Sequence, residues 1–99
     1  MKVDFTESAR ADLLAIGDYI ALDNPLRALS FMDELEERCM ALESLPYAYP
    51  ILARRPLSNI RRLVHGNYNI FYSVTSDVIS ILHILNSAMN YENILFPEV

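Results

Sequence analysis

The chain has 99 residues, of which 53% are hydrophobic, and a formal net charge of −5. This length allows one domain with one core, so we treat residues 1–99 as a single unit. The composition excludes a disordered or fibrous chain, and we find neither an apolar run long enough to cross a bilayer nor an export signal. Since Cys39 is the single cysteine, no internal disulfide can form. We expect a cytoplasmic protein.

The charge is divided unevenly along the chain. Residues 1–45 hold four basic and ten acidic side chains, whereas residues 46–99 hold four arginines and three acids. Because non-specific binding to nucleic acid scales with the number of phosphates neutralised, we expect this acidic chain to bind nucleic acid poorly without specificity, and we expect no direct specific nucleic-acid binding by it. The arginines bind carboxylates well and predict a clamp for an acidic peptide, or else ordinary surface salt bridges to the acidic helices. They are Arg54, Arg55, Arg61 and Arg62.

The N-terminal half predicts one strand and two helices. Residues 2–5 alternate apolar and charged side chains, as an edge or central strand would. Thr6 is a suitable N-cap for a helix over about 7–22, and Asn24 with Pro25 begins a second helix over about 25–45. Both helices carry an apolar stripe at helical spacing. So short a link predicts that they pack against each other as an antiparallel hairpin.

Residues 46–59 contain three prolines and no consistent period, so we expect an irregular loop. A loop of this length in a small domain is often functional or ordered by a partner. The alternative is that it simply lies across the sheet.

The only stretch dense in strand formers follows this loop. It predicts strands over about 60–65, 68–75 and 78–85, separated by a Gly66-Asn67 turn and by the polar break Thr75–Asp77. These strands form an antiparallel meander, with one apolar face on the middle strand and two on the last. One face of the last strand is expected to meet the helices and the other a partner. Residues 91–96 add a helical turn or a strand.

Few residues indicate chemistry. Cys39, His65 and His83 are far apart in the sequence, so we expect no metal site, and no motif for a phosphate or other cofactor is present. His65 is either a general base beside the arginines or a half-exposed residue at a strand end. His83 is expected to be a hydrogen-bonded histidine of the core or an interface. Arg61 and Arg62 are consecutive on a strand and must point to opposite faces, so only one of them can face a groove.

Three segments together resemble the RelE/ParE superfamily of type II toxin–antitoxin toxins. They are IRRLVHGNYNIFYSV at 60–74, ISILHIL at 79–85 and YENILFPEV at 91–99. The resemblance implies an α+β fold in which an N-terminal antiparallel helical hairpin packs on a twisted antiparallel sheet of three to four strands. It also implies a cognate antitoxin, of the ParD-like ribbon-helix-helix kind, whose chain drapes over that fold in a hetero-oligomer.

The resemblance implies two alternative activities. RelE-like members cleave messenger RNA in the ribosome, whereas ParE-like members inhibit DNA gyrase without catalysis. After the last strand this chain has Asn86-Ser87-Ala88-Met89-Asn90, where many relatives have a histidine, an arginine and an aspartate, and neither asparagine nor methionine can replace them chemically. We therefore expect a ParE-like gyrase inhibitor that is not an enzyme. The alternatives are a RelE-like nuclease and a non-toxic binding module of the same fold.

The same resemblance assigns residues to roles. No catalytic residue is expected, but a nuclease would use Arg61, Arg62, His65 and Tyr91. The antitoxin is expected to contact Arg54, Arg55, Arg61, Arg62 and Tyr72. The target is expected to contact Tyr91, Leu95 and Phe96.

Overall fold

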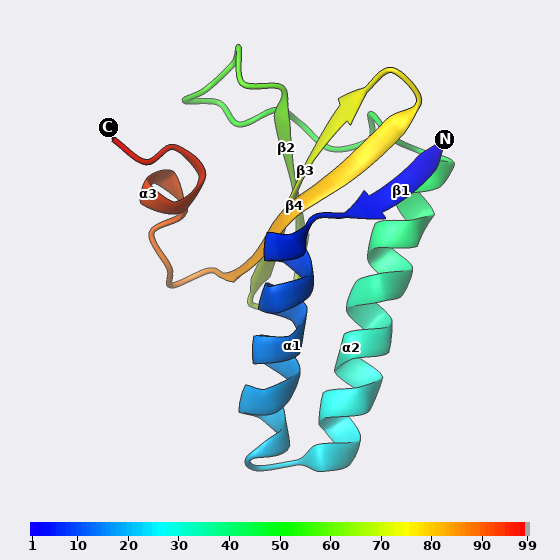
Figure 1. Ribbon diagram of the computed structural model, residues 1–99, viewed down its shortest axis with the longest axis vertical. Helices are drawn as coiled ribbons and strands as arrows, with labels where there is room; N and C mark the ends of the chain where they lie inside the picture. The colour runs from blue at the N-terminus through cyan, green and yellow to red at the C-terminus, as the bar shows by residue number, and fades with distance from the viewer. Residues whose placement is uncertain (99) are drawn as a thin grey trace.

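The computed structural model describes residues 1–98 and contains a helical hairpin, a four-stranded sheet and a short C-terminal helix (Figure 1). The elements in chain order are β1 (Lys2–Phe5), α1 (Glu7–Ala21), α2 (Pro25–Met40), the 3₁₀ helix η1 (Ala41–Glu43), β2 (Ile60–His65), β3 (Tyr68–Thr75), β4 (Val78–Asn86) and α3 (Tyr91–Leu95). Among the described residues no helix has the length and apolar character needed to cross a membrane.

The two long helices begin at the predicted caps. The side chain of Thr6 accepts a hydrogen bond from the Ala9 amide (3.1 Å), and that of Asn24 accepts one from the Arg27 amide (3.0 Å). Helix α2 is shorter than predicted, because it ends at Met40 and tightens into η1. Pro46 disfavours helical geometry in Leu45 and cannot donate to the Leu42 carbonyl, so it limits how far the chain remains helical after η1.

The sheet has the order β1-β4-β3-β2. Strands β2, β3 and β4 form the predicted antiparallel meander, whose turns place Gly66 and Ser76 at positive φ. Strand β1 lies at the edge and runs parallel to β4, so the sheet is mixed and the expectation of an antiparallel sheet is corrected at this strand. The helical hairpin makes the parallel pairing possible, because a long connection separates β1 from the meander.

The helical hairpin covers one face of the sheet, and the C-terminal segment covers part of the other. The helix face carries Ile70, Tyr72 and Val74 of β3, which pack with both long helices in the main core. The outer face carries Phe71, which is fully buried in a second cluster with Leu52 and Leu85. The residues that close this second cluster come from β2 and the C-terminal segment: Ile60, Tyr91, Ile94, Leu95 and Phe96. The sequence predicts that a partner covers the second face of β4. Around Leu85 this face is covered instead by the chain's own C-terminal segment.

The loop 46–59 lies along the free edge of β2. The Leu52 amide donates to the Ile60 carbonyl (2.9 Å), and the Arg62 amide donates to the Pro50 carbonyl (3.2 Å). Farther along the same edge, Arg38 of α2 donates to the Val64 carbonyl (3.1 Å). These bonds satisfy edge groups of β2 that would otherwise be open to another strand.

Candidate functional site

The paired arginines lie on opposite faces of β2, as predicted from strand alternation. Arg61 is on the helix face, where its Nη1 donates to the Tyr49 carbonyl (2.6 Å) and its guanidinium lies 5.2 Å from the centre of the Tyr47 ring. Arg61 therefore holds the loop 46–59 against the sheet. Arg62 is on the outer face, with its guanidinium 5.8 Å from the centre of the Tyr91 ring.

Arg62 borders a hollow of about 520 Å³ on the outer face, which we call the outer hollow. It lies between β2, β3 and the segment that follows β4. The lining residues are Arg54, Arg62, Val64, Asn69, Ser87, Met89, Asn90, Tyr91 and Glu92. Two of the four clustered arginines, Arg54 from the loop and Arg62 from β2, thus line the same hollow.

The other loop arginine anchors the C-terminal segment. Arg55 forms an ion pair with Glu92 (3.2 Å), and its guanidinium lies 4.3 Å from the centre of the Phe96 ring. Tyr91 packs on Phe71 with ring centres 5.0 Å apart. Leu95 and Phe96, predicted to contact a target, are partly buried in this second cluster, so only part of each side chain is available at the surface.

The expectation that Tyr72 contacts an antitoxin is corrected by its position. Tyr72 has no exposed surface and belongs to the main core. Its hydroxyl donates to the Pro46 carbonyl (2.9 Å), and burial raises the pKa of the phenol above its usual value of 10.0. A residue at this position of β3 points to the helix face, so Tyr72 supports the fold and the loop rather than a partner.

Both histidines are paired with carboxylates away from the outer hollow. His65 lies on the helix face, where Nε2 is 3.1 Å from Oε1 of Glu34 in α2. Hydrogen bonds from Arg27 and then from His65 lower the pKa of Glu34 below its usual value of 4.5. His83 Nδ1 lies 2.7 Å from Oδ2 of Asp12, which confirms a hydrogen-bonded histidine. The residues proposed for a nuclease are therefore divided between the two faces of the sheet.

Asn69 is a site residue that the sequence pattern did not single out. It lies on the outer face of β3, opposite Val64 of β2 and Leu85 of β4, and only 9% of it is exposed. It is the one buried polar residue among residues 1–98. The available signal was a polar side chain in the middle of a strand that is otherwise covered on both faces.

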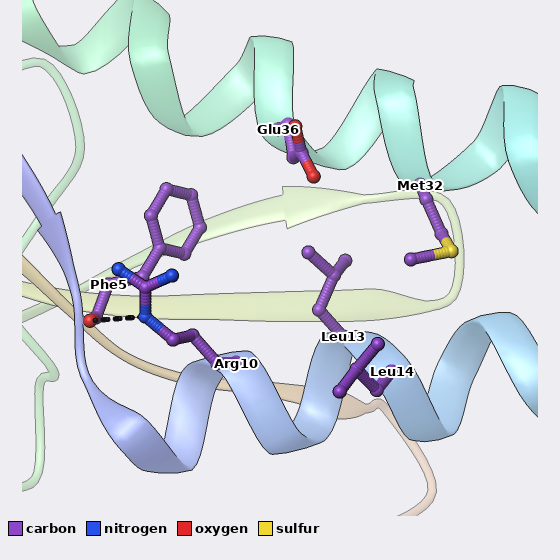
Figure 2. Close-up of a pocket in the computed structure, with 6 residues that line it drawn as sticks. All are labelled: Phe5, Arg10, Leu13, Leu14, Met32 and Glu36. Atoms are coloured by element: carbon purple, nitrogen blue, oxygen red, sulfur yellow. Dashed lines mark hydrogen bonds between the residues drawn. The ribbon is translucent and has the colours of Figure 1, made fainter.

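A second concave surface, the hairpin groove, lies between the exposed sides of α1 and α2. It consists of two adjoining hollows of about 390 and 350 Å³ that share Leu14 and Met32. Figure 2 shows the first of these hollows, with Leu13 and Leu14 from α1 and Met32 from α2 directed into the space between the helices. At its β1 end, Arg10 Nε donates to the Phe5 carbonyl (3.4 Å).

Gly17 lets the two helices of the groove approach closely. A β-carbon added at this position would overlap the sulfur of Met32. Gly17, Ala28 and Met32 contribute to an apolar lining, and Leu14 on the rim of the groove is 62% exposed. Within residues 1–98 no group of three or more His, Cys, Asp or Glu side chains is placed to hold a metal ion.

Strand β1, the helical hairpin and the three-stranded meander together form an α+β fold with a mixed sheet, and comparison with known proteins confirms the resemblance inferred from the sequence. The family described as ParE toxin of the type II toxin–antitoxin system parDE matches residues 3–91. The chain belongs to that family.

Solved structures are similar in fold. A chromosomal ParDE toxin–antitoxin system from P. aeruginosa aligns with a TM-score of 0.74 and 24% identity, covering 87% of this chain and 95% of that chain. The toxin–antitoxin complex RelBE2 from Mycobacterium tuberculosis aligns with a TM-score of 0.64 and 23% identity, covering 86% and 95%. Among curated proteins no sequence match was found.

Proposed function

We propose that this member of the ParE family inhibits DNA gyrase by protein–protein contact and is neutralised by a cognate ParD-like antitoxin. The separation of the possible nuclease residues carries this choice. Arg61 and His65 face the helices, whereas Arg62 and Tyr91 border the outer hollow. Acid–base catalysis requires its groups within hydrogen-bond reach of one substrate, so this division supports a binding protein over an RNA-cleaving enzyme.

The overall charge supports the same choice. A ribosome-dependent nuclease must enter a site surrounded by RNA phosphates, and a chain of net charge −5 is repelled from such a site at long range. In our proposal the target contacts the surface formed by Tyr91 and the exposed parts of Leu95 and Phe96. Because α3 is anchored through Phe71 and Arg55, this surface is presented on a fixed support.

The hairpin groove is the proposed docking surface for an amphipathic helix of the antitoxin. Its apolar floor matches the mode in which a helix lays one face into a hydrophobic groove. The groove is bordered by the acids Asp18 and Glu36 and by a single basic residue, Arg10. We therefore expect the antitoxin helix to carry apolar residues on one side and basic residues beside them.

Two assays with the purified chain test the proposed activity. We expect it to block DNA supercoiling by gyrase and to leave messenger RNA intact in a translation extract. Cleavage of messenger RNA within the ribosome would overturn the proposal in favour of the RelE-like nuclease, for which Arg62 and Tyr91 remain together at the outer hollow. If expression without an antitoxin leaves growth unchanged, the non-toxic binding module is supported instead.

A pair of leucine substitutions tests the antitoxin surface. Leu14 on the groove rim is 62% exposed and Leu45, after η1, is 65% exposed, so replacing either with glutamate removes little buried surface. We expect Leu14→Glu to weaken binding of the antitoxin encoded beside this chain at least about ten-fold, and Leu45→Glu to leave it unchanged. Equal affinities for the two variants would exclude the hairpin groove as the docking surface.

A further inference from the structure

Asn69 presents its amide to the outer hollow. Only 9% of the residue is exposed, and within residues 1–98 the fully enclosed side-chain atoms that lack a hydrogen-bond partner are Nε of Arg38 and Nε of Arg61, not those of Asn69. The small exposed part of Asn69 therefore includes its amide, whose donor and acceptor can be reached from the outer hollow that it lines.

Two guanidinium groups line the same hollow and are not neutralised. Neither Arg54 nor Arg62 forms an ion pair within residues 1–98, whereas Arg55 is paired with Glu92. Glu92 is the only acid among the lining residues, and Arg55 already holds its carboxylate at 3.2 Å. The outer hollow therefore presents two available positive charges beside an amide that faces the hollow.

The Tyr91 ring restricts the position of one of these charges. The Arg62 guanidinium lies 5.8 Å from the centre of that ring, within the range of a cation–π contact. Arg62 and Asn69 project from adjacent strands on the same face, because Val64, two residues after Arg62, is paired directly with Asn69. The two side chains can thus act on one ligand.

The balance of charge indicates what that ligand is. A carboxylate accepts hydrogen bonds from both a guanidinium and an amide N–H, and it needs only the one or two positive charges available here. A nucleic-acid backbone would bring several phosphates to a chain of net charge −5, which opposes it. The exposed apolar side chains of Val64 (54%) and Met89 (47%) in the wall suit an apolar residue next to the acid.

We propose that the outer hollow is a carboxylate-binding site that receives one Asp or Glu side chain of an extended peptide, with Asn69 and Arg62 as its direct ligands. Arg54 contributes the second positive charge. The proposal rests on the proposed function in one respect, since the peptide is assigned to the antitoxin. The site then selects an antitoxin tail in which an acidic residue stands beside an apolar one.

Small probes test the site without the antitoxin. The ¹⁵N-labelled chain is titrated with N-acetyl-glutamate N-methylamide and, separately, with the glutamine analogue, inorganic phosphate and AMP. We expect the glutamate probe to shift the side-chain signals of Asn69 and Arg62, and to bind at least ten-fold more tightly than the glutamine probe. Equal shifts with the glutamine probe, or tighter binding of AMP or phosphate, would overturn the proposal.

Two substitutions at position 69 separate binding from folding. Asn69→Leu replaces the amide with an apolar group of similar size, so we expect a stable fold and a dissociation constant for the glutamate probe raised at least ten-fold. Asn69→Ala, which adds no bulk, is expected to weaken the probe to a similar extent. Lys2→Ala removes one positive charge at the far edge of the sheet and should leave binding unchanged. Unaltered affinity in both Asn69 variants would contradict the assignment.

The antitoxin provides the last comparison. We expect Asn69→Leu to weaken antitoxin binding, and replacement of the matching acid in the antitoxin to weaken it no further in that background. Additive losses would show that the acid binds elsewhere. Failure of the proposed function is seen separately, because the gyrase and growth assays use the unaltered chain and do not depend on Asn69.

Discussion

His83 and Asp12 are 71 positions apart in the chain, yet Nδ1 of His83 lies 2.7 Å from Oδ2 of Asp12. The same carboxylate oxygen accepts the Ile84 amide (2.9 Å). Strand β1 covers the edge of β4 only as far as Ile81, and beyond it the edge is met by Thr6, whose hydroxyl donates to the Leu82 carbonyl (3.0 Å), and by Asp12. Helix α1 therefore completes an edge that the sheet leaves open.

Replacing Asp12 tests this contact. In Asp12→Ala the Ile84 amide and the imidazole lose their acceptor while still partly buried, so we expect the free energy of unfolding to fall by about 1–3 kcal/mol. Urea denaturation measures the difference. Asp18→Ala, an exposed position on the same helix, should change stability by less than about 0.5 kcal/mol. Equal losses would mean that the edge contact contributes nothing specific.

Glu34 predicts a dependence of stability on acid pH. Its pKa in the folded chain is below the usual 4.5, first because of the hydrogen bond from Arg27 and then because of that from His65. This stabilisation is present above pH 4.5 and is lost as the pH falls through the lowered pKa. We expect the urea midpoint of the unaltered chain to fall more between pH 5 and 3 than that of Glu34→Gln, while Glu37→Gln follows the unaltered chain.

Cys39 is predicted to be unreactive in the folded chain. It has no exposed surface, and burial raises the pKa of its thiol to about 12, so almost no thiolate is present at pH 8. We expect a chromogenic disulfide reagent to modify Cys39 only as fast as the chain opens, and quickly in urea. A Cys39→Ala, Ser44→Cys variant, with its thiol at an exposed position, should react at once. Rapid labelling of native Cys39 would contradict its burial.

The Tyr72 hydroxyl is predicted to stabilise the loop 46–59. Tyr72→Phe removes the donor to the Pro46 carbonyl, and we expect a loss of about 0.5–1.5 kcal/mol by urea denaturation. The matched control is Tyr19→Phe, because Tyr19 is 71% exposed and its loss of a hydroxyl should be neutral. We also expect faster proteolysis within 46–59 in the Tyr72 variant only.

Apolar packing, more than the Arg55–Glu92 ion pair, is predicted to hold α3 on the sheet. Phe71 is fully buried beneath Tyr91, so Phe71→Ala should cost about 3–5 kcal/mol. The side chain of Arg55 is 47% exposed, and an exposed pair contributes about 0–1 kcal/mol, so Arg55→Ala should cost far less. Limited proteolysis of the C-terminal segment provides a second measurement. A larger effect of Arg55→Ala than of Phe71→Ala would show that the ion pair, and not apolar packing, mainly holds α3 on the sheet.

The helices and strands could be predicted from the sequence. Caps at Thr6 and Asn24, the Gly66-Asn67 turn and the alternation of the meander are decided by groups a few residues apart, so the helices, the three strands and the opposite directions of Arg61 and Arg62 follow from them. The sequence predicts a helix to about residue 45, whereas α2 ends at Met40, because α-helical and 3₁₀ geometry from Ala41 onward differ by less than residue preferences can discriminate.

Other features depended on contacts between residues distant in the chain. The pairing of β1 with β4 brings Phe5 beside Ile81. Residues near β1 in the sequence do not indicate which strand it pairs with, or whether the two strands run parallel or antiparallel. The burial of Tyr72 and the gathering of Arg54, Arg62 and Asn69 at one hollow likewise depend on which face each strand turns to the helices. The sequence by itself thus determined the elements and their apolar faces. Only the tertiary structure decided which polar side chains meet, because that depends on packing across the whole sheet.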